Sequence, residues 1–209
     1  MKKIFLAILF SGIFFGAKSQ TLAQIKYILD TTNNPIGFVK FVLKKKFYID
    51  TVAVLSTSAF ISRADSLAYH GKVGKVYGPF KKENILIKIL MKAPNTFYHV
   101  KHIVLDTSTY SQQFAEKLAD SIMARIISGA ATFADQASTY SEDYVSSVRG
   151  GDLGWFVRGA MLPQLDEALG THKKGDLFKV WTAAGLHIVL IPDDPKKDTG
   201  FALFLRVLL

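Results

Sequence analysis

The spacing of hydrophobic and polar residues divides the chain after residue 20 into two blocks of predicted secondary structure. In the first block, three stretches are rich in β-branched and aromatic side chains, as strands are: residues 36–43, 47–56 and 85–90. Residues 61–69 have a weaker, helical pattern. The stretch KAPN at residues 92–95 predicts a linker, so we expect a small strand-rich module over residues 20–94.

The second block begins with a predicted strand and a helix. Residues 98–106 alternate, which places His102 on one face together with Val100 and Val104. A helix follows, with Ser111 as its N-cap and Gly129 at its C-terminal end. Its apolar positions recur every four residues: Phe114, Leu118, Ile122 and Ile126.

Further capping signals predict the elements up to residue 191. Thr132 and Asp135 have capping-box spacing at the start of a second helix. Pro163 is a favourable first residue for a third helix. LFKVWT and GLHIVLI then predict two strands joined at Ala183–Ala184. Residues 98–191 therefore have the predicted order β-α-α-turn-α-β-β.

The chain ends in an almost wholly apolar stretch, GFALFLRVLL, after a linker with the sequence PDDPKKD at residues 192–198. A free apolar strand would be prone to aggregation, and the first block has strands without an evident partner. We therefore expect residues 201–207 to cross back and pair with strands between residues 36 and 90, so that the second block is an insertion.

The first 19 residues have the pattern of a secretory signal peptide. Lys2 and Lys3 precede an apolar run at residues 4–17, and small residues follow at the spacing expected for cleavage before Gln20. An uncleaved membrane anchor is the less favoured alternative, because the run is shorter than the ~20 residues that span a bilayer. We expect an exported protein in the periplasm or outside the cell. The absence of cysteine excludes a lipoprotein, disulfides and thiolate catalysis.

The formal net charge of +9 includes three lysines and no acid before Gln20, which leaves +6 for the mature chain. Lysines cluster at residues 44–46, 81–82, 173–174 and 196–197. A basic surface can bind nucleic acid or an anionic membrane. An exported protein rarely meets nucleic acid, so we interpret the charge as a solvated surface, compatible with a peripheral contact with acidic lipid headgroups.

Three glycines crowd the stretch RGGDLGWF at residues 149–156, immediately before two large aromatic rings. Clustered glycine indicates backbone angles or close approaches that other residues cannot adopt. A hairpin turn ahead of a strand is one interpretation. A turn that holds Leu153 and Phe156 in the floor of a functional site is the other.

The motifs of the second block resemble the parvulin-type peptidyl-prolyl cis–trans isomerases over roughly residues 98–191. The resemblance is carried by HIVL at His102 and by four later stretches: FADQASTYSED, GGDLGWFVRGAMLPQLDEAL, KKGD and GLHIVLI. It implies an α+β fold, in which helices surround a four-stranded antiparallel sheet in a domain of residues 95–191. The strand-rich module at residues 20–94 would be a smaller addition.

The resemblance also implies the residues of the site. His102 and His187 would lie side by side on the central strands, with Asp143 at the mouth, as the catalytic group. The substrate proline would be bound by Leu153, Phe156, Met161, Leu165 and Thr182. For Asp143 two alternatives stay open: the family position falls on Tyr144 instead, or Asp143 only caps a loop.

Three positions depart from the family pattern. Leu165 stands where an aromatic ring is usual, and Ala184 replaces a hydroxyl residue beside the second histidine. Asp106 stands where phosphate-dependent members have basic residues, so specificity for phosphorylated Ser/Thr-Pro is not expected. Leu165 and Ala184 favour a parvulin-like binding or chaperone module with little catalysis, whereas the two histidines, Asp143, Phe156 and Met161 favour an isomerase.

The isomerase chemistry implied by the resemblance needs no cofactor and no metal. His99 and His102 have the spacing of metal ligands, but on a strand, residues three apart point to opposite faces. A hydrolase is not supported, because no serine lies in a recognisable nucleophile turn. We expect unfolded or partly folded proline-containing polypeptides as partners and no nucleic acid.

Residues 74–90 align without gaps with residues 175–191, and Leu86 then stands at the position of His187. Two interpretations stay open. The first block is a decayed isomerase half, or the two stretches are merely similar strand-turn-strand units. Either way the first block lacks the active residues and is expected to act in docking or as a chaperone.

Overall fold

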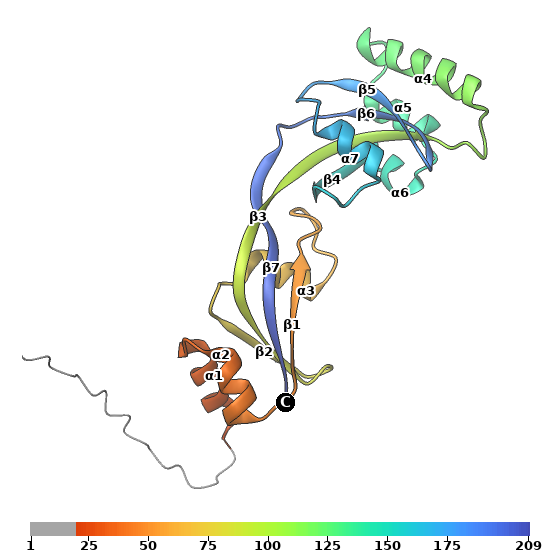
Figure 1. Ribbon diagram of the computed structural model, residues 1–209. Helices are drawn as coiled ribbons and strands as arrows, with labels where there is room; N and C mark the ends of the chain where they lie inside the picture. Colours follow the sequence, from red (N-terminus) through yellow and green to blue (C-terminus); the bar gives the residue numbers. More distant parts are fainter. Residues whose placement is uncertain (1–19) are drawn as a thin grey trace, which may run out of the picture.

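The computed structural model describes residues 20–209, so the predicted signal peptide lies outside the described residues. Its backbone is organised around one long strand, β3 (Ile85–Leu105), which runs through both halves of the molecule (Figure 1). The linker predicted at residues 92–95 is wrong, because these residues lie inside β3. Pro94 fits in the strand since the register with the neighbouring strand shifts between Ala93 and Pro94, where a ladder hydrogen bond is not needed.

Seven antiparallel strands form a single sheet around β3. One edge of β3 pairs with β7 (Lys196–Leu208) and then with β6 (Gly185–Leu190), and its other edge pairs with β2 (Val76–Phe80) and then with β4 (Asp152–Val157). The outer strands are β1 (Phe47–Ala53) beside β7, and β5 (Leu177–Thr182) beside β6.

The upper module, residues 97–191, contains the strands β5-β6-β3-β4 and four helices. These are α4 (Gln112–Ile127), α5 (Phe133–Tyr140), α6 (Tyr144–Ser147) and α7 (Pro163–Leu169). One face of the sheet packs on α4 and α5, and the other packs on α7. This arrangement confirms the expected four-stranded antiparallel sheet with surrounding helices.

The capping signals of the upper module were predicted correctly. Ser111 caps α4, Thr132 and Asp135 form a capping box on α5, and Pro163 is the first residue of α7. Three of the four predicted apolar positions of α4, Leu118, Ile122 and Ile126, pack against the sheet, whereas Phe114 is 53% exposed and stacks on Tyr110. The fully buried positions of the helix are Ala115, Ala119 and Ile122, because small side chains let α4 approach the sheet closely.

The lower module, residues 20–96 together with β7, contains the strands β1-β7-β3-β2. Helix α1 (Leu22–Thr31), the short α2 (Pro35–Gly37) and the π-helix η1 (Phe38–Leu43) cover one face, and α3 (Arg63–His70) covers the other. The strand predicted at residues 36–43 is therefore wrong. Asn34 caps a turn opened by Pro35, and Ile36, Val39 and Leu43 then have helical spacing and pack beside α1.

The tail pairs as predicted. Strand β7 lies between β1 and β3, with Val207 opposite both Phe47 and Leu86. The paired segment is longer than the sequence indicated, because it begins at Lys196, inside the stretch predicted as a linker. The upper module is thus inserted between chain segments that build the lower one.

The similarity of residues 74–90 to residues 175–191 extends to the strand order of the two modules. Both stretches form hairpins, β2–β3 and β5–β6, and each hairpin follows a helix, α3 or α7. The modules have equivalent strand orders, β2-β3-β7-β1 and β5-β6-β3-β4. In the lower module β7 therefore takes the position that β3 takes in the upper module. The gapless alignment is nevertheless off by one residue. Leu86 faces α1, on the side opposite to α3, whereas His187 shares a face with Val189, which packs on α7. Because α3 and α7 precede the two hairpins, a shift of one residue would bring equivalent faces together.

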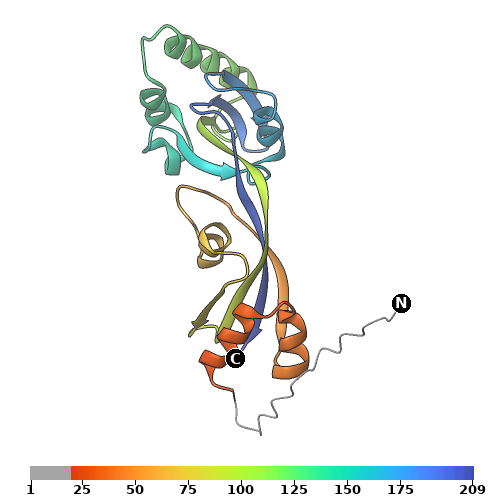
Figure 2. The ribbon, with the colours of Figure 1, turned by 90° about the vertical axis from the view of Figure 1, so that its left-hand side faces the viewer.

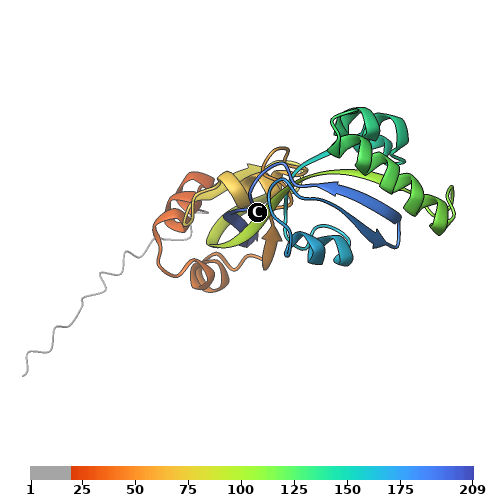
Figure 3. The ribbon, with the colours of Figure 1, turned by 90° about the horizontal axis from the view of Figure 1, so that it is seen from above.

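The molecule is elongated, with α4 and its neighbours at one end and α1 and η1 at the other (Figure 2, Figure 3). The modules also meet at a loop after β1, where the Leu55 carbonyl accepts the Val157 N–H and Ser56 forms a β-bridge with Phe156. Within residues 20–209, no helix is long and apolar enough to cross a membrane.

Candidate active site

His102 on β3 and His187 on β6 face each other across adjacent strands. Their Nδ1 atoms are 3.4 Å apart, their ring centroids are 5.4 Å apart, and both side chains are buried. Alternation along β3 and β6 directs both rings to the face that packs on α7. The structure therefore brings together the two histidines that the resemblance implies to be neighbours.

The hydrogen-bond partners of the two rings fix their protons. The Asp143 carboxylate only accepts, so His102 Nε2–H donates to Asp143 Oδ2 at 2.8 Å. In neutral rings His102 Nδ1 then accepts from His187 Nδ1–H, and His187 Nε2 accepts from the Thr182 hydroxyl at 2.8 Å. With both imidazoles neutral, every member of this Thr182–His187–His102–Asp143 row has a hydrogen-bond partner.

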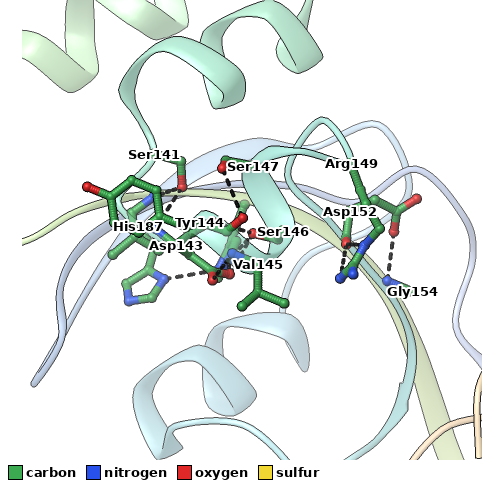
Figure 4. Close-up of polar contacts among 12 residues, drawn as sticks. Ser141, Asp143, Tyr144, Val145, Ser146, Ser147, Arg149, Asp152, Gly154 and His187 are labelled. Atoms are coloured by element: carbon green, nitrogen blue, oxygen red, sulfur yellow. Dashed lines mark hydrogen bonds and ion pairs between the residues drawn. The ribbon is translucent and has the colours of Figure 1, made fainter.

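Asp143 is positioned by the short helix α6, which it caps. Its Oδ1 accepts the Val145 N–H, and its Oδ2 accepts from the Ser146 hydroxyl at 2.5 Å (Figure 4). Ser141, two residues before Asp143, ties this part of the chain to β3, because its Oγ accepts the Val104 N–H. Asp143 therefore does more than cap a loop, since it caps α6 and also accepts a hydrogen bond from His102.

Ser146 is a site residue that the sequence analysis missed. Its side chain is fully buried, and its Oγ lies 3.1 Å from His102 Nε2 as well as contacting Asp143. The sequence feature that could have indicated Ser146 is its position three residues after Asp143, the N-cap of α6. This spacing places both side chains on the first turn of the helix. Tyr144, the alternative to Asp143, has a 78% exposed side chain.

Burial and these contacts shift the pKa values of the site. Burial lowers the pKa of His187 to about 4, and the adjacent His102 ring adds to the effect. Burial also lowers the pKa of His102, although the bond to Asp143 acts in the opposite direction. Burial alone would raise the pKa of Asp143, but bonds from Ser146 and His102 outweigh it and the pKa is lowered. At neutral pH the site holds two neutral rings and one carboxylate.

The glycine-rich turn is built against the first histidine. Gly151 has a φ of +80°, and a Cβ there would lie 2.4 Å from the His102 carbonyl oxygen. The same residue accepts the His102 N–H through its carbonyl and donates to the Ser146 carbonyl. Only glycine fits this approach, so the turn fixes α6, and with it Asp143, beside the strand that carries His102.

The predicted proline-binding residues gather on the same face of the sheet. Phe156 and Leu165 are only 3% and 2% exposed, and they pack in one cluster with Val100, Phe178 and Val189. Leu153 and Met161 are partly buried against this cluster. Phe156 and Leu165 therefore belong to the core of the upper module, whereas Leu153 and Met161 lie at the margin of that core.

His99 belongs to a different cluster from His102. Its Nδ1 lies 2.7 Å from Asp193 and its Nε2 2.9 Å from Asp152, and its ring stacks on Trp155. Among residues 20–209, no group of three or more histidine and acidic side chains is arranged to hold a metal ion. His99 is thus held by two carboxylates and an indole ring, apart from the pair formed by His102 and His187.

Sequence comparison identifies residues 84–195 as a match to the PPIC-type PPIASE domain. Over 102 residues the chain is 35% identical to a protein named chaperone SurA from Bordetella avium, covering 48% of this chain and 20% of that protein. It is 33% identical over 147 residues to the peptidyl-prolyl cis-trans isomerase pin1 of Rhizopus delemar, covering 70% of this chain and 87% of that one. The chain thus spans about a fifth of the SurA relative.

Solved structures give matches of limited extent. The peptidylprolyl isomerase PrsA from Bacillus anthracis is 29% identical with a TM-score of 0.42, over 49% of this chain and 43% of that one. A PpiC-type isomerase domain is 26% identical with a TM-score of 0.44, over 51% of this chain and 94% of that one.

Proposed function

The chain belongs to the PPIC-type, or parvulin, family of peptidyl-prolyl isomerases, and on this premise we propose that it catalyses cis–trans rotation of X–Pro bonds. The observation that carries the proposal is the fully satisfied Thr182–His187–His102–Asp143 row beside an apolar cluster. We assign catalytic roles to His102, Asp143 and His187. Leu153, Phe156, Met161, Leu165 and Thr182 would form or support the proline site.

The reaction needs a surface that favours a twisted amide over a planar one. Rotation of a peptide bond faces a barrier of roughly 18–20 kcal/mol, which comes from resonance in the planar form. A twisted amide loses this resonance and part of its dipole, so binding it against apolar side chains lowers the barrier. Leu153 and Met161, at the margin of the buried cluster, offer such a surface.

The histidine row contributes fixed orientation and no covalent step. Neutral rings held between Thr182 and Asp143 keep one arrangement of protons and bring no cation next to the substrate. The carboxylate at the mouth places a negative charge near the amide that rotates. Preorganised groups of this kind need no rearrangement during the reaction.

The experiment that tests the proposal is a protease-coupled isomerase assay on proline tetrapeptides with alanine, leucine or glutamate before proline. We expect a rate above that of spontaneous isomerisation, which takes tens to hundreds of seconds. A glutamate peptide should react no faster than an alanine peptide, because Asp106 stands where phosphate-dependent relatives are basic. No acceleration with any peptide would overturn the isomerase proposal.

A chaperone or binding function with little catalysis is the second candidate. It is supported by Leu165, which is buried where the family usually has an aromatic ring, by Ala184, and by the name chaperone SurA of a relative. This candidate predicts that the protein suppresses client aggregation while it accelerates isomerisation little or not at all. Aggregation assays on an unfolded client, run with the same preparation as the peptide assay, separate the two.

We also propose where the protein works and on what. The signal-peptide pattern supports export to the periplasm, and partly folded envelope or secreted polypeptides are then the available substrates. The basic composition supports a peripheral contact with anionic membrane surfaces. Amino-terminal sequencing of the protein from envelope fractions tests export, with Gln20 as the expected first residue.

A further inference from the structure

Two lysine-rich loops meet at the end of the lower module. The Leu208 N–H donates to the Lys46 carbonyl, and the Leu209 N–H donates to the Asn84 carbonyl. Residues 44–46 and residues 81–84 therefore lie on opposite sides of one strand, β7, at about 10 Å from each other given the usual strand spacing. Together with residues 40–42 of η1 they form what we call the basic tip.

The lysines of the basic tip have no acidic partner. Lys40, Lys44, Lys45, Lys46, Lys81 and Lys82 are all exposed, and none of them forms an ion pair within residues 20–209. The two acids nearest to them in sequence are already engaged, since Glu83 pairs with Arg63 and Asp50 pairs with Arg206. The positive charge of the tip is therefore left for an external partner.

Large apolar side chains project among these lysines. Phe41 is 69% exposed, Val42 is 59% exposed, and the Lys40 ammonium lies 5.2 Å from the Phe41 ring centroid. On β1, Tyr48 is 60% exposed. A purely solvated basic surface gains nothing from exposing these side chains to water, whereas aromatic and aliphatic groups flanked by lysine are typical of surfaces that lie in a membrane interface.

We infer that the basic tip is the surface with which this protein binds an anionic lipid bilayer, an inference that rests on the peripheral membrane contact proposed above. The lysines would lie over acidic headgroups, and Phe41 and Val42 would enter the interfacial region. A second copy of the chain is a poor occupant, because self-association through the tip would bring six lysines against six. The site of His102 lies in the other module, at the far end of β3 (Figure 1).

Vesicle co-sedimentation of the full exported protein tests the assignment. Vesicles of phosphatidylcholine alone are compared with an equimolar mixture of phosphatidylcholine and phosphatidylglycerol, at low and high salt. The tip variants are Lys45→Gln/Lys46→Gln and Lys81→Gln/Lys82→Gln. The matched control is Lys173→Gln/Lys174→Gln, which removes the same charge from the upper module.

We expect wild type to bind only the anionic vesicles, and each tip pair to weaken the partition roughly 10- to 100-fold. The control pair should bind like wild type, and Phe41→Ser should weaken the binding that persists at high salt. Equal losses in tip and control variants, or none in the tip variants, would overturn the assignment. A wild type that ignores anionic vesicles, or that dimerises through the tip in sedimentation velocity, would overturn it too.

Isomerase rates are measured on the same preparations. We expect both tip variants to keep the wild-type rate, because no residue of the tip lies in the upper module. A loss of vesicle binding at an unchanged isomerase rate therefore concerns the membrane surface alone. Absence of isomerase activity in every preparation would count against the proposed catalysis and leave the vesicle result as it stands.

Discussion

At the scale of single residues, the neutral state of the buried imidazoles links the site to pH. An unfolded histidine has a pKa near 6.5, whereas burial lowers that of His187 to about 4. The folded protein therefore binds fewer protons than the unfolded chain between these values. The stability from this group is fully present above pH 6.5 and is lost as the pH falls towards 4.

We predict that the free energy of unfolding falls by about 2 kcal/mol between pH 7.5 and pH 5 from His187 alone. Urea denaturation at the two pH values measures it. The pKa values of Asp143, Asp152 and Asp198 are lowered, so these carboxyl groups stay ionised over this range and contribute little. His187→Asn should show a smaller fall than wild type, and an equal fall in both would contradict the prediction.

Thr182 offers the cleanest test of the hydrogen-bonded row. Thr182→Val keeps the shape of the side chain and removes the donor to His187 Nε2, which leaves a buried acceptor unsatisfied. We predict a loss of roughly 1–3 kcal/mol in stability and at least a severalfold loss in kcat/KM. Thr182→Ser restores the hydroxyl and should recover most of both. If serine rescues neither, the hydroxyl is not the relevant group.

Phe156 and Met161 should behave differently when each is changed to alanine. The resemblance implies that both residues bind the substrate proline, but Phe156 is 3% exposed and packs in the core of the upper module. We predict that Phe156→Ala costs roughly 3–5 kcal/mol of stability. Met161→Ala should mainly raise KM for proline peptides. Similar melting temperatures for the two variants would refute this distinction.

At the scale of elements, the sequence predicted best where capping and periodicity acted locally. Ser111, Thr132 and Pro163 marked helix starts that the structure has, and the alternation around His102 placed that ring correctly. Residues 36–43 were misassigned because a run of β-branched and aromatic residues has the same composition in a buried helix as in a strand. The contact of Ser146 with His102 was not predicted, because it joins α6 to a strand residue 44 positions away in the sequence.

The role of β7 also belongs to this scale, and truncation after Asp198 tests it. The truncation removes the strand that joins β1 to β3, including the fully buried Phe204. We predict loss of protection from hydrogen exchange in residues 47–53 and 85–91, together with aggregation. Amides of residues 101–105 should stay protected, because they pair with β6. Phe204→Ala should weaken the lower module without exposing an edge, and unchanged solubility of the truncated chain would contradict the prediction.

At the scale of the whole molecule, β3 makes the two modules one continuous sheet. The residue at which a sequence pattern suggested a break, Pro94, instead sits at a local register shift inside the strand. A linker would let the site of His102 move freely relative to the basic tip. A shared strand fixes the distance and direction between them, so a protein that rests on a membrane by its tip would hold its catalytic face away from the lipid.

The place of β7 between β1 and β3 also determines when the lower sheet can form during synthesis of the chain. Asp50 and its partner Arg206 are 156 residues apart, and at usual elongation rates this separation takes roughly 8 to 30 s to translate. The upper module has its last strand by residue 190, before residues 201–208 have emerged. Until residues 201–208 follow, β1 and β3 keep an unpaired edge beside an upper module whose strands are all present. A chain interrupted late in synthesis would therefore carry a complete histidine site on an open, aggregation-prone lower half.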